Sequence, residues 1–129
     1  MTPQVGFPLF LLITVLLLAG VVATGLKARL RLHLSLVALA LAALGTTIWF
    51  AEQLGEYYDL ESAGAITPIH LTLAKLTTVG YLLPLGTGLL TLRNRRWRRR
   101  HFACALLILG LTAMTAISGT WMILAATPL

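Results

Sequence analysis

The chain has little cysteine and little negative charge. Its single cysteine, Cys104, excludes an internal disulfide and any metal site built from a cysteine pair. Cys104 lies inside an apolar run, where packing is the expected role of an isolated thiol. All four acidic residues fall within residues 52–61, so no carboxylate lies in the interior of an apolar run. No serine–histidine–acid arrangement, metalloprotease helix motif or phosphate-binding loop can be assembled, and we expect no enzymatic activity.

Apolar residues dominate what is present. They make up 58% of the 129 residues, and the mean hydropathy of +0.89 is too high for a soluble domain. Four apolar runs are each close to the ~20 residues that a helix needs to cross a bilayer. They predict membrane spans at residues 7–26, 30–52, 66–92 and 102–126. The expected fold is all-α, an integral membrane four-helix bundle that forms a single transmembrane domain over residues 1–129.

The charges alternate from one connection to the next. Six arginines lie within residues 93–100, and Lys27, Arg29 and Arg31 form the other basic connection, whereas the remaining connection holds every acid. Because positive loops stay in the cytoplasm, we expect both basic loops inside and both termini outside. Basic residues follow the first apolar run and do not precede it, which favours an uncleaved span over a signal peptide. The net charge of +6 is confined to these short loops, so it indicates anionic lipid headgroups and not nucleic acid as the partner.

Two features predict how the helices pack. Small residues recur at helical spacing in the second span and form a stripe that lets another helix approach closely; they are Ser35, Ala38, Ala42 and Gly45. In the third span, Pro84 is interior and predicts a kink, because proline removes one backbone hydrogen bond. The connection over residues 53–65 is expected to contain a short helical turn.

The three histidines are the strongest candidates for ligands. His33 and His101 begin the second and fourth spans on the cytoplasmic side, and such a pair at equal depth suits a b-type haem, with copper as the alternative. His70 begins the third span on the opposite side and is a separate candidate metal ligand. The alternative for all three is that interfacial histidines contact headgroups and water. The face that follows His70 is polar and small, so it is expected to point at other helices; it contains Ala74, Thr77, Tyr81 and Gly88.

Lys75 is unusual because it lies about 13 Å into the third span at 1.5 Å per residue. A lysine at the centre of a membrane helix costs about 2.5–3.5 kcal/mol, so a compensating partner is expected. One alternative is that the side chain extends outward and pairs with Glu52 on the second helix. The other is that it points inward, toward Thr112 or Thr115 on the fourth helix. Partner binding or proton handling at Lys75 depends on which alternative holds.

Several of these stretches resemble a family of small bacterial membrane proteins, domain of unknown function 420 (CtaM/YozB-like). The resemblance covers the second to fourth helices. It rests on His33, on His70 with Ala74, on Arg100-His101 and on the segment Thr115-Ala116-Ile117-Ser118-Gly119-Thr120-Trp121. Pro84 also stands where the family tends to place a proline. The family has a further histidine at the outer end of the second helix, where this chain has Gly55 and Glu56.

The resemblance implies a multi-pass protein of the bacterial cytoplasmic membrane. It implies a non-enzymatic accessory or assembly role for a respiratory haem–copper oxidase, with haem or copper held by histidines. A second hypothesis is a small b-type cytochrome that carries electrons through one haem between His33 and His101. A third is a structural subunit that docks into a larger membrane complex, with the histidines incidental. The orientation of the histidines and the cofactor content distinguish these three.

Overall fold

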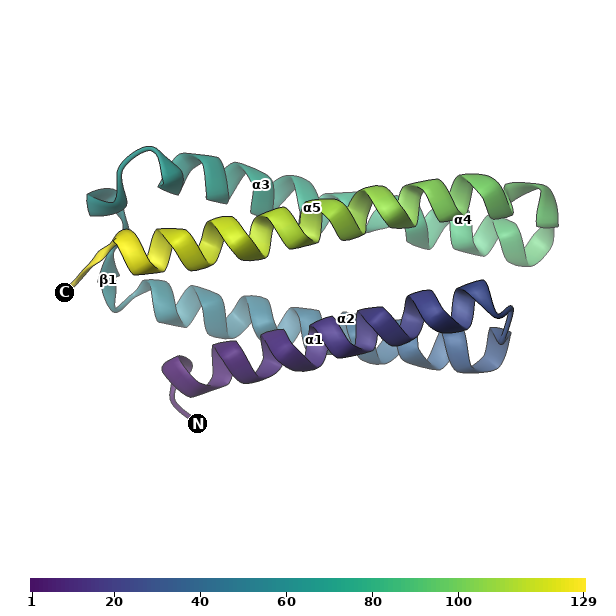
Figure 1. The fold of residues 1–129 in the computed structure, drawn as a ribbon, viewed down its shortest axis with the longest axis horizontal. Coiled ribbons are helices and arrows are strands. Elements are labelled where there is room, and N and C mark those ends of the chain that lie inside the picture. Colours follow the sequence, from purple (N-terminus) through teal and green to yellow (C-terminus); the bar gives the residue numbers. More distant parts are fainter. The chain divides into compact units, whose positions relative to one another are not determined.

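A computed structural model describes all 129 residues, of which 87% are helical. Four helices are long and apolar enough to cross a membrane, which confirms an all-α chain with several membrane spans. The chain divides into two compact units, Met1–Tyr58 and Asp59–Leu129, and each is described by itself (Figure 1).

The first unit is a pair of antiparallel helices, α1 (Pro3–Leu26) and α2 (Leu30–Gly55). Helix α1 begins four residues before the predicted span, because Pro3 occupies one of the first helical positions, where its missing N–H is not needed. The short turn between the helices places Ala28 at a positive φ of 54°. The helices are longer than the apolar runs because hydropathy marks the bilayer and not the end of the helix.

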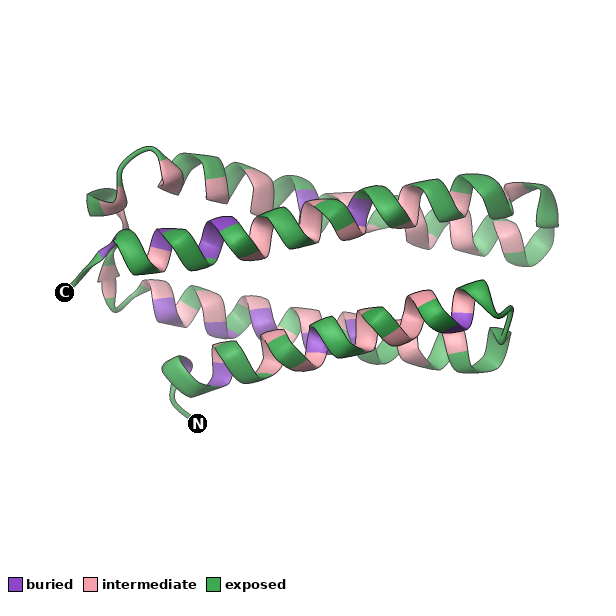
Figure 2. Ribbon diagram, viewed as in Figure 1, coloured by how far each residue is buried: buried purple, intermediate pink, exposed green.

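Aromatic and hydroxyl side chains hold α1 against α2. The rings of Phe10 and Phe50 stack with centroids 5.6 Å apart. Near the middle of the pair, the Thr14 and Thr47 hydroxyl oxygens are 3.0 Å apart and buried. The buried residues of α2 lie along the side that meets α1 (Figure 2); they are Ala40, Ala43, Thr47, Phe50 and Leu54. The predicted stripe that begins at Ser35 is exposed, so these small residues do not form this interface.

The second unit contains the remaining elements. In chain order they are β1 (Tyr58–Asp59, beginning on the last residue of the first unit), η1 (Leu60–Ala63), α3 (Ile66–Gly80), α4 (Leu82–Arg93), η2 (Arg95–Trp97), α5 (Arg98–Ala125) and β2 (Thr127–Pro128). The two short strands pair with each other. The turn η1 confirms the helical turn expected in the acidic connection. The third span breaks at Tyr81, three residues before Pro84, as expected because proline cannot donate to the carbonyl of Gly80.

Helices α3 and α4 both pack on α5. One close approach is at Gly80, where an added Cβ would lie 2.6 Å from Cδ1 of the fully buried Ile108. The polar face expected to point at other helices does so: Thr77 bonds to Thr115, and Tyr81 bonds to Thr112. Three of the loop arginines belong to the first turn of α5, because arginine favours the helical conformation and this turn extends the helix past the apolar run.

Candidate functional site

The three histidines share one local arrangement, here called the histidine–glycine contact. Each imidazole lies against a glycine on the helix that packs beside it, and the residue before that glycine carries a hydroxyl group. The three contacts are His33 on Thr24-Gly25, His70 on Ser118-Gly119 and His101 on Thr87-Gly88. Glycine leaves room for the ring: a Cβ on Gly119 would overlap it, and a Cβ on Gly25 or Gly88 would require the ring to shift slightly.

The tightest contact is made by His70. A Cβ on Gly119 would stand 2.6 Å from Cε1 of the ring, closer than real Cβ atoms approach. The Nδ1 atom of His70 lies 3.1 Å from the Ser118 hydroxyl oxygen. That hydroxyl donates its own proton to the carbonyl of Thr115 at 3.1 Å. Nδ1 therefore carries the ring proton and donates it to Ser118.

The contact of His33 forms within the first unit. Its Nδ1 atom lies 2.9 Å from the Val21 carbonyl oxygen and 3.4 Å from the hydroxyl oxygen of Thr24. A carbonyl oxygen can only accept, so Nδ1–H of His33 is the donor. A Cβ on Gly25 would lie 3.1 Å from Cε1 of the ring, so the imidazole is close-packed against α1.

The contact of His101 repeats this geometry between α4 and α5. Its Nδ1 atom lies 3.3 Å from the hydroxyl oxygen of Thr87, which donates its proton to the Leu83 carbonyl at 2.7 Å. Nδ1 of His101 is therefore a donor as well. A Cβ on Gly88 would lie 3.2 Å from Cε1 of the ring.

The three imidazoles are thus oriented in the same way. With the proton on Nδ1, a neutral ring has its lone pair on Nε2, the nitrogen that such a ring would present to a metal. Histidines that ligate metals usually donate their other N–H to a carbonyl or another oxygen, and that bond fixes the tautomer. Each histidine therefore fits the role of a single nitrogen ligand.

The structure forms no multidentate metal site. No three histidine, cysteine, aspartate or glutamate side chains lie close enough to share an ion. Within the second unit, the residues that contact His70 lie near position 118 of α5, about 26 Å along the helix from His101. His33 belongs to the first unit and His101 to the second. The haem pair His33–His101 and the metal role of His70 stay predictions.

Lys75 is exposed on α3. The hydroxyl groups of Thr112 and Thr115, which the inward alternative names as partners of Lys75, bond to Tyr81 and Thr77. Glu52 is exposed as well, but it belongs to the other unit, so the predicted Lys75–Glu52 pair stays a prediction.

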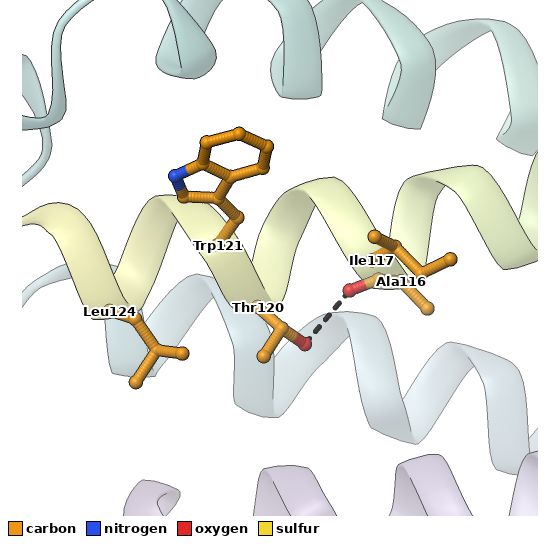
Figure 3. A pocket seen from close by; sticks show the side chains of 5 residues that line it. All are labelled: Ala116, Ile117, Thr120, Trp121 and Leu124. Atoms are coloured by element: carbon orange, nitrogen blue, oxygen red, sulfur yellow. Dashed lines mark hydrogen bonds between the residues drawn. The ribbon is translucent and has the colours of Figure 1, made fainter.

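An apolar hollow lies along α5 (Figure 3). It has a volume of about 420 Å³ and is lined by Ala116, Ile117, Thr120, Trp121 and Leu124. The single hydroxyl group here, on Thr120, donates to the Ala116 carbonyl of its own helix at 2.9 Å. The hollow therefore offers no unpaired hydroxyl for chemistry. Cys104 is half-buried and has no disulfide partner.

The hydroxyl–glycine pairs were not predicted as parts of the site. The signal was present, since Thr24-Gly25, Thr87-Gly88 and Ser118-Gly119 are all visible in the sequence. This signal can be recognised only when it is known which helices pack together, because each hydroxyl–glycine pair lies between 9 and 48 residues from its histidine. Comparison with protein-family models, curated proteins and solved structures finds no match to this chain.

Proposed function

We propose that this chain is a non-enzymatic accessory protein of the bacterial cytoplasmic membrane that serves the assembly of a respiratory haem–copper oxidase. The observation that carries the proposal is the contact of His70 with Ser118-Gly119. It joins two stretches on which the family resemblance rests, although they lie 48 residues apart. Their meeting in space is what a shared role for these residues requires.

The orientation of the chain is part of the proposal. Apart from Lys75 in α3, the basic residues of each unit lie at or beside a turn between antiparallel helices, and the acids lie in the last turn of α2 and between α2 and α3. Because arginine and lysine are retained in the cytoplasm, both basic turns face inward, and both termini and the acidic segment face outward. By this orientation His33 and His101 lie near the inner surface and His70 near the outer one.

The number of histidines at each point indicates how the protein would bind copper or haem. Each unit brings no more than a single fixed imidazole to any one point, which does not suit a resident copper ion with three donors from this chain. It suits a metal or haem in transit, to which the oxidase or another partner supplies the remaining ligands. In this proposal copper or haem is cargo, and the chain contributes one oriented Nε2 atom at a time.

Complementation tests the role in the cell. The gene is deleted in its source bacterium, and membranes are assayed for oxidase-dependent oxygen consumption and for the reduced spectrum of the oxidase haems. We expect both to fall, wild-type protein to restore them, and His70→Ala to fail while reaching the membrane at normal level. The matched control is Thr120→Ala, which removes an exposed hydroxyl beside the contact. Unchanged oxidase activity in the deletion strain contradicts the proposal.

A second measurement does not depend on activity. The purified protein is examined by absorption spectroscopy, oxidised and reduced, with metal analysis on the same sample. We expect no tightly held haem and less than one metal ion per chain, because neither unit by itself brings two histidines together. A stoichiometric b-type spectrum that disappears in His33→Ala or His101→Ala would instead identify a cytochrome. Full complementation by variants of all three histidines would identify a docking subunit.

A further inference from the structure

The arginine-rich connection between α4 and α5 folds into a defined hollow. A cavity of about 370 Å³ is lined by Asn94, Arg96, Trp97 and Arg100. The guanidinium carbon of Arg100 lies 4.8 Å from the centroid of the Trp97 ring, which is a cation–π contact. Two arginines and one indole therefore border the same space.

The local sequence explains why these side chains converge. The side chain of Asn94 accepts a hydrogen bond from the Arg96 N–H at 3.0 Å, and the carbonyl of Asn94 accepts one from the Trp97 N–H at 3.1 Å. These bonds fold residues 95–97 into the single turn η2, after which α5 begins at Arg98. Arg100 then projects from the first turn of α5 toward the Trp97 ring that precedes it.

Nothing in this connection neutralises its charge. Residues 93–100 contain six arginines and no carboxylate, and all six arginines are exposed. The acids of the second unit, Asp59 and Glu61, lie before α3, at the far end of the helices from this connection. The first backbone N–H groups of α5 add a partial positive charge, with no acidic side chain in the first turn to offset it.

We propose that this cavity binds the phosphate of an anionic phospholipid at the membrane surface. The planar forks of Arg96 and Arg100 match a phosphate with paired hydrogen bonds, which a lysine cannot reproduce. Trp97 contributes an amphipathic ring of the kind that prefers the headgroup region. The proposal rests on the cavity and on the two membrane helices that flank it, and it does not depend on the oxidase role.

The position of the cavity favours a lipid over other phosphate sources. It lies between the ends of two helices long enough to span a membrane. At the membrane surface the local concentration of lipid phosphates is much higher than that of soluble phosphates. Only one aromatic ring borders it, whereas binding of single-stranded nucleic acid requires a series of stacking rings.

Native mass spectrometry of the delipidated full-length protein in detergent tests the proposal. The probes are phosphatidylglycerol and phosphatidylcholine, supplied separately and as an equal mixture. We expect one phosphatidylglycerol to bind with at least about tenfold preference over phosphatidylcholine. Both lipids carry a phosphate, but the choline cation of phosphatidylcholine offsets that charge and is repelled by the arginines. R96Q/R100Q should abolish the preference. R98Q/R99Q removes the same charge outside the cavity lining and should keep it.

Two further variants keep the test decisive. R96K/R100K retains the charge but not the forks, and we expect it to recover only part of the preference. Circular dichroism would show whether R96Q/R100Q folds. If it does not, Trp97→Ala still tests the cavity, because it retains every arginine and should weaken lipid binding. Equal losses in R96Q/R100Q and R98Q/R99Q would overturn the proposal in favour of diffuse attraction. Displacement of the lipid by millimolar inorganic phosphate would assign the cavity to a soluble anion, and binding of a short RNA in preference to lipid would also overturn it.

Discussion

At the scale of single residues, the histidine contacts constrain the glycines that the rings lie against. A Cβ on Gly119 would overlap the His70 ring, so Gly119→Ala must move either the ring or α5. Overpacking of this kind costs about 1–3 kcal/mol, and we expect the free energy of unfolding to fall by that amount. The measurement is equilibrium unfolding in mixed detergent micelles, followed by circular dichroism.

Gly110 provides the matched control on the same helix. An added Cβ there meets nothing within 4 Å, so Gly110→Ala should be neutral or stabilise the helix by up to about 1 kcal/mol. If the two variants unfold alike, the close contact between His70 and Gly119 is not a feature of the protein in solution.

The histidines of the candidate site could be predicted from the sequence, but the glycines that they contact could not. A histidine in an apolar run is visible in the sequence because its polarity is costly there. A glycine is not, because the sequence alone does not say whether it admits a ring, as Gly119 does, or faces open space, as Gly110 does. The distinction arises only when two helices meet in register. The same limit left two orientations open for Lys75, since one apolar helix can present any side to lipid.

At the scale of helices, hydroxyl pairs link α3 to α5. The hydroxyl of Thr115 donates to the Leu111 carbonyl at 2.8 Å, so Thr77 must donate to Thr115 across the 2.9 Å between their oxygens. Bonds of this type in membranes contribute on average about 0.6 kcal/mol. In a double-mutant cycle of Thr77→Val and Thr115→Val, we expect a coupling energy near this value from unfolding in mixed micelles.

A matched cycle uses Thr78 in place of Thr77. Thr78 is exposed, and its hydroxyl bonds to the Ala74 carbonyl of its own helix. Thr78→Val combined with Thr115→Val should be additive. A coupling as large as that of the first pair would mean that the Thr77–Thr115 bond carries no specific energy between the helices.

The helices themselves could be predicted well. Bilayer thickness fixes the length of an apolar run, and the position of Pro84 fixes where the third span breaks, so both were evident without the structure. The ends were less accurate. Arg98–Arg100 extend α5 beyond its apolar run because arginine favours the helix, and Pro3 begins α1 early because proline suits the first helical turn. The stripe containing Ser35 was predicted to pack, but small residues do not identify which helix they meet.

At the scale of the whole molecule, both units contain a helical hairpin of the same plan. In each, a Thr-Gly pair near the end of one helix contacts the histidine near the start of the next, and the basic residues lie between them. The threonine and histidine are 9 residues apart in the first unit and 14 in the second. The two hairpins therefore share the histidine contact but differ in the length of the turn.

The shared plan makes a prediction about orientation. Because both basic turns resist transfer across the membrane, they must lie on the same side, and the acidic segment between the units must lie on the other. In a Cys104→Ala background, Glu56→Cys should react with a membrane-impermeant maleimide added to spheroplasts. Asn94→Cys should react only after the membrane is permeabilised. Labelling of Asn94→Cys in intact spheroplasts would reverse the proposed topology.

If the arginines orient the second unit in the membrane, their removal should change that orientation. With all six arginines of residues 93–100 changed to glutamine, one basic turn remains, at Lys27, Arg29 and Arg31. The first unit should keep its orientation, whereas the turn between α4 and α5 loses the charge that retains it in the cytoplasm. We therefore expect part of the population to label at position 94 without permeabilisation. Uniform protection of that position would mean that the order of insertion, and not local charge, orients the second unit.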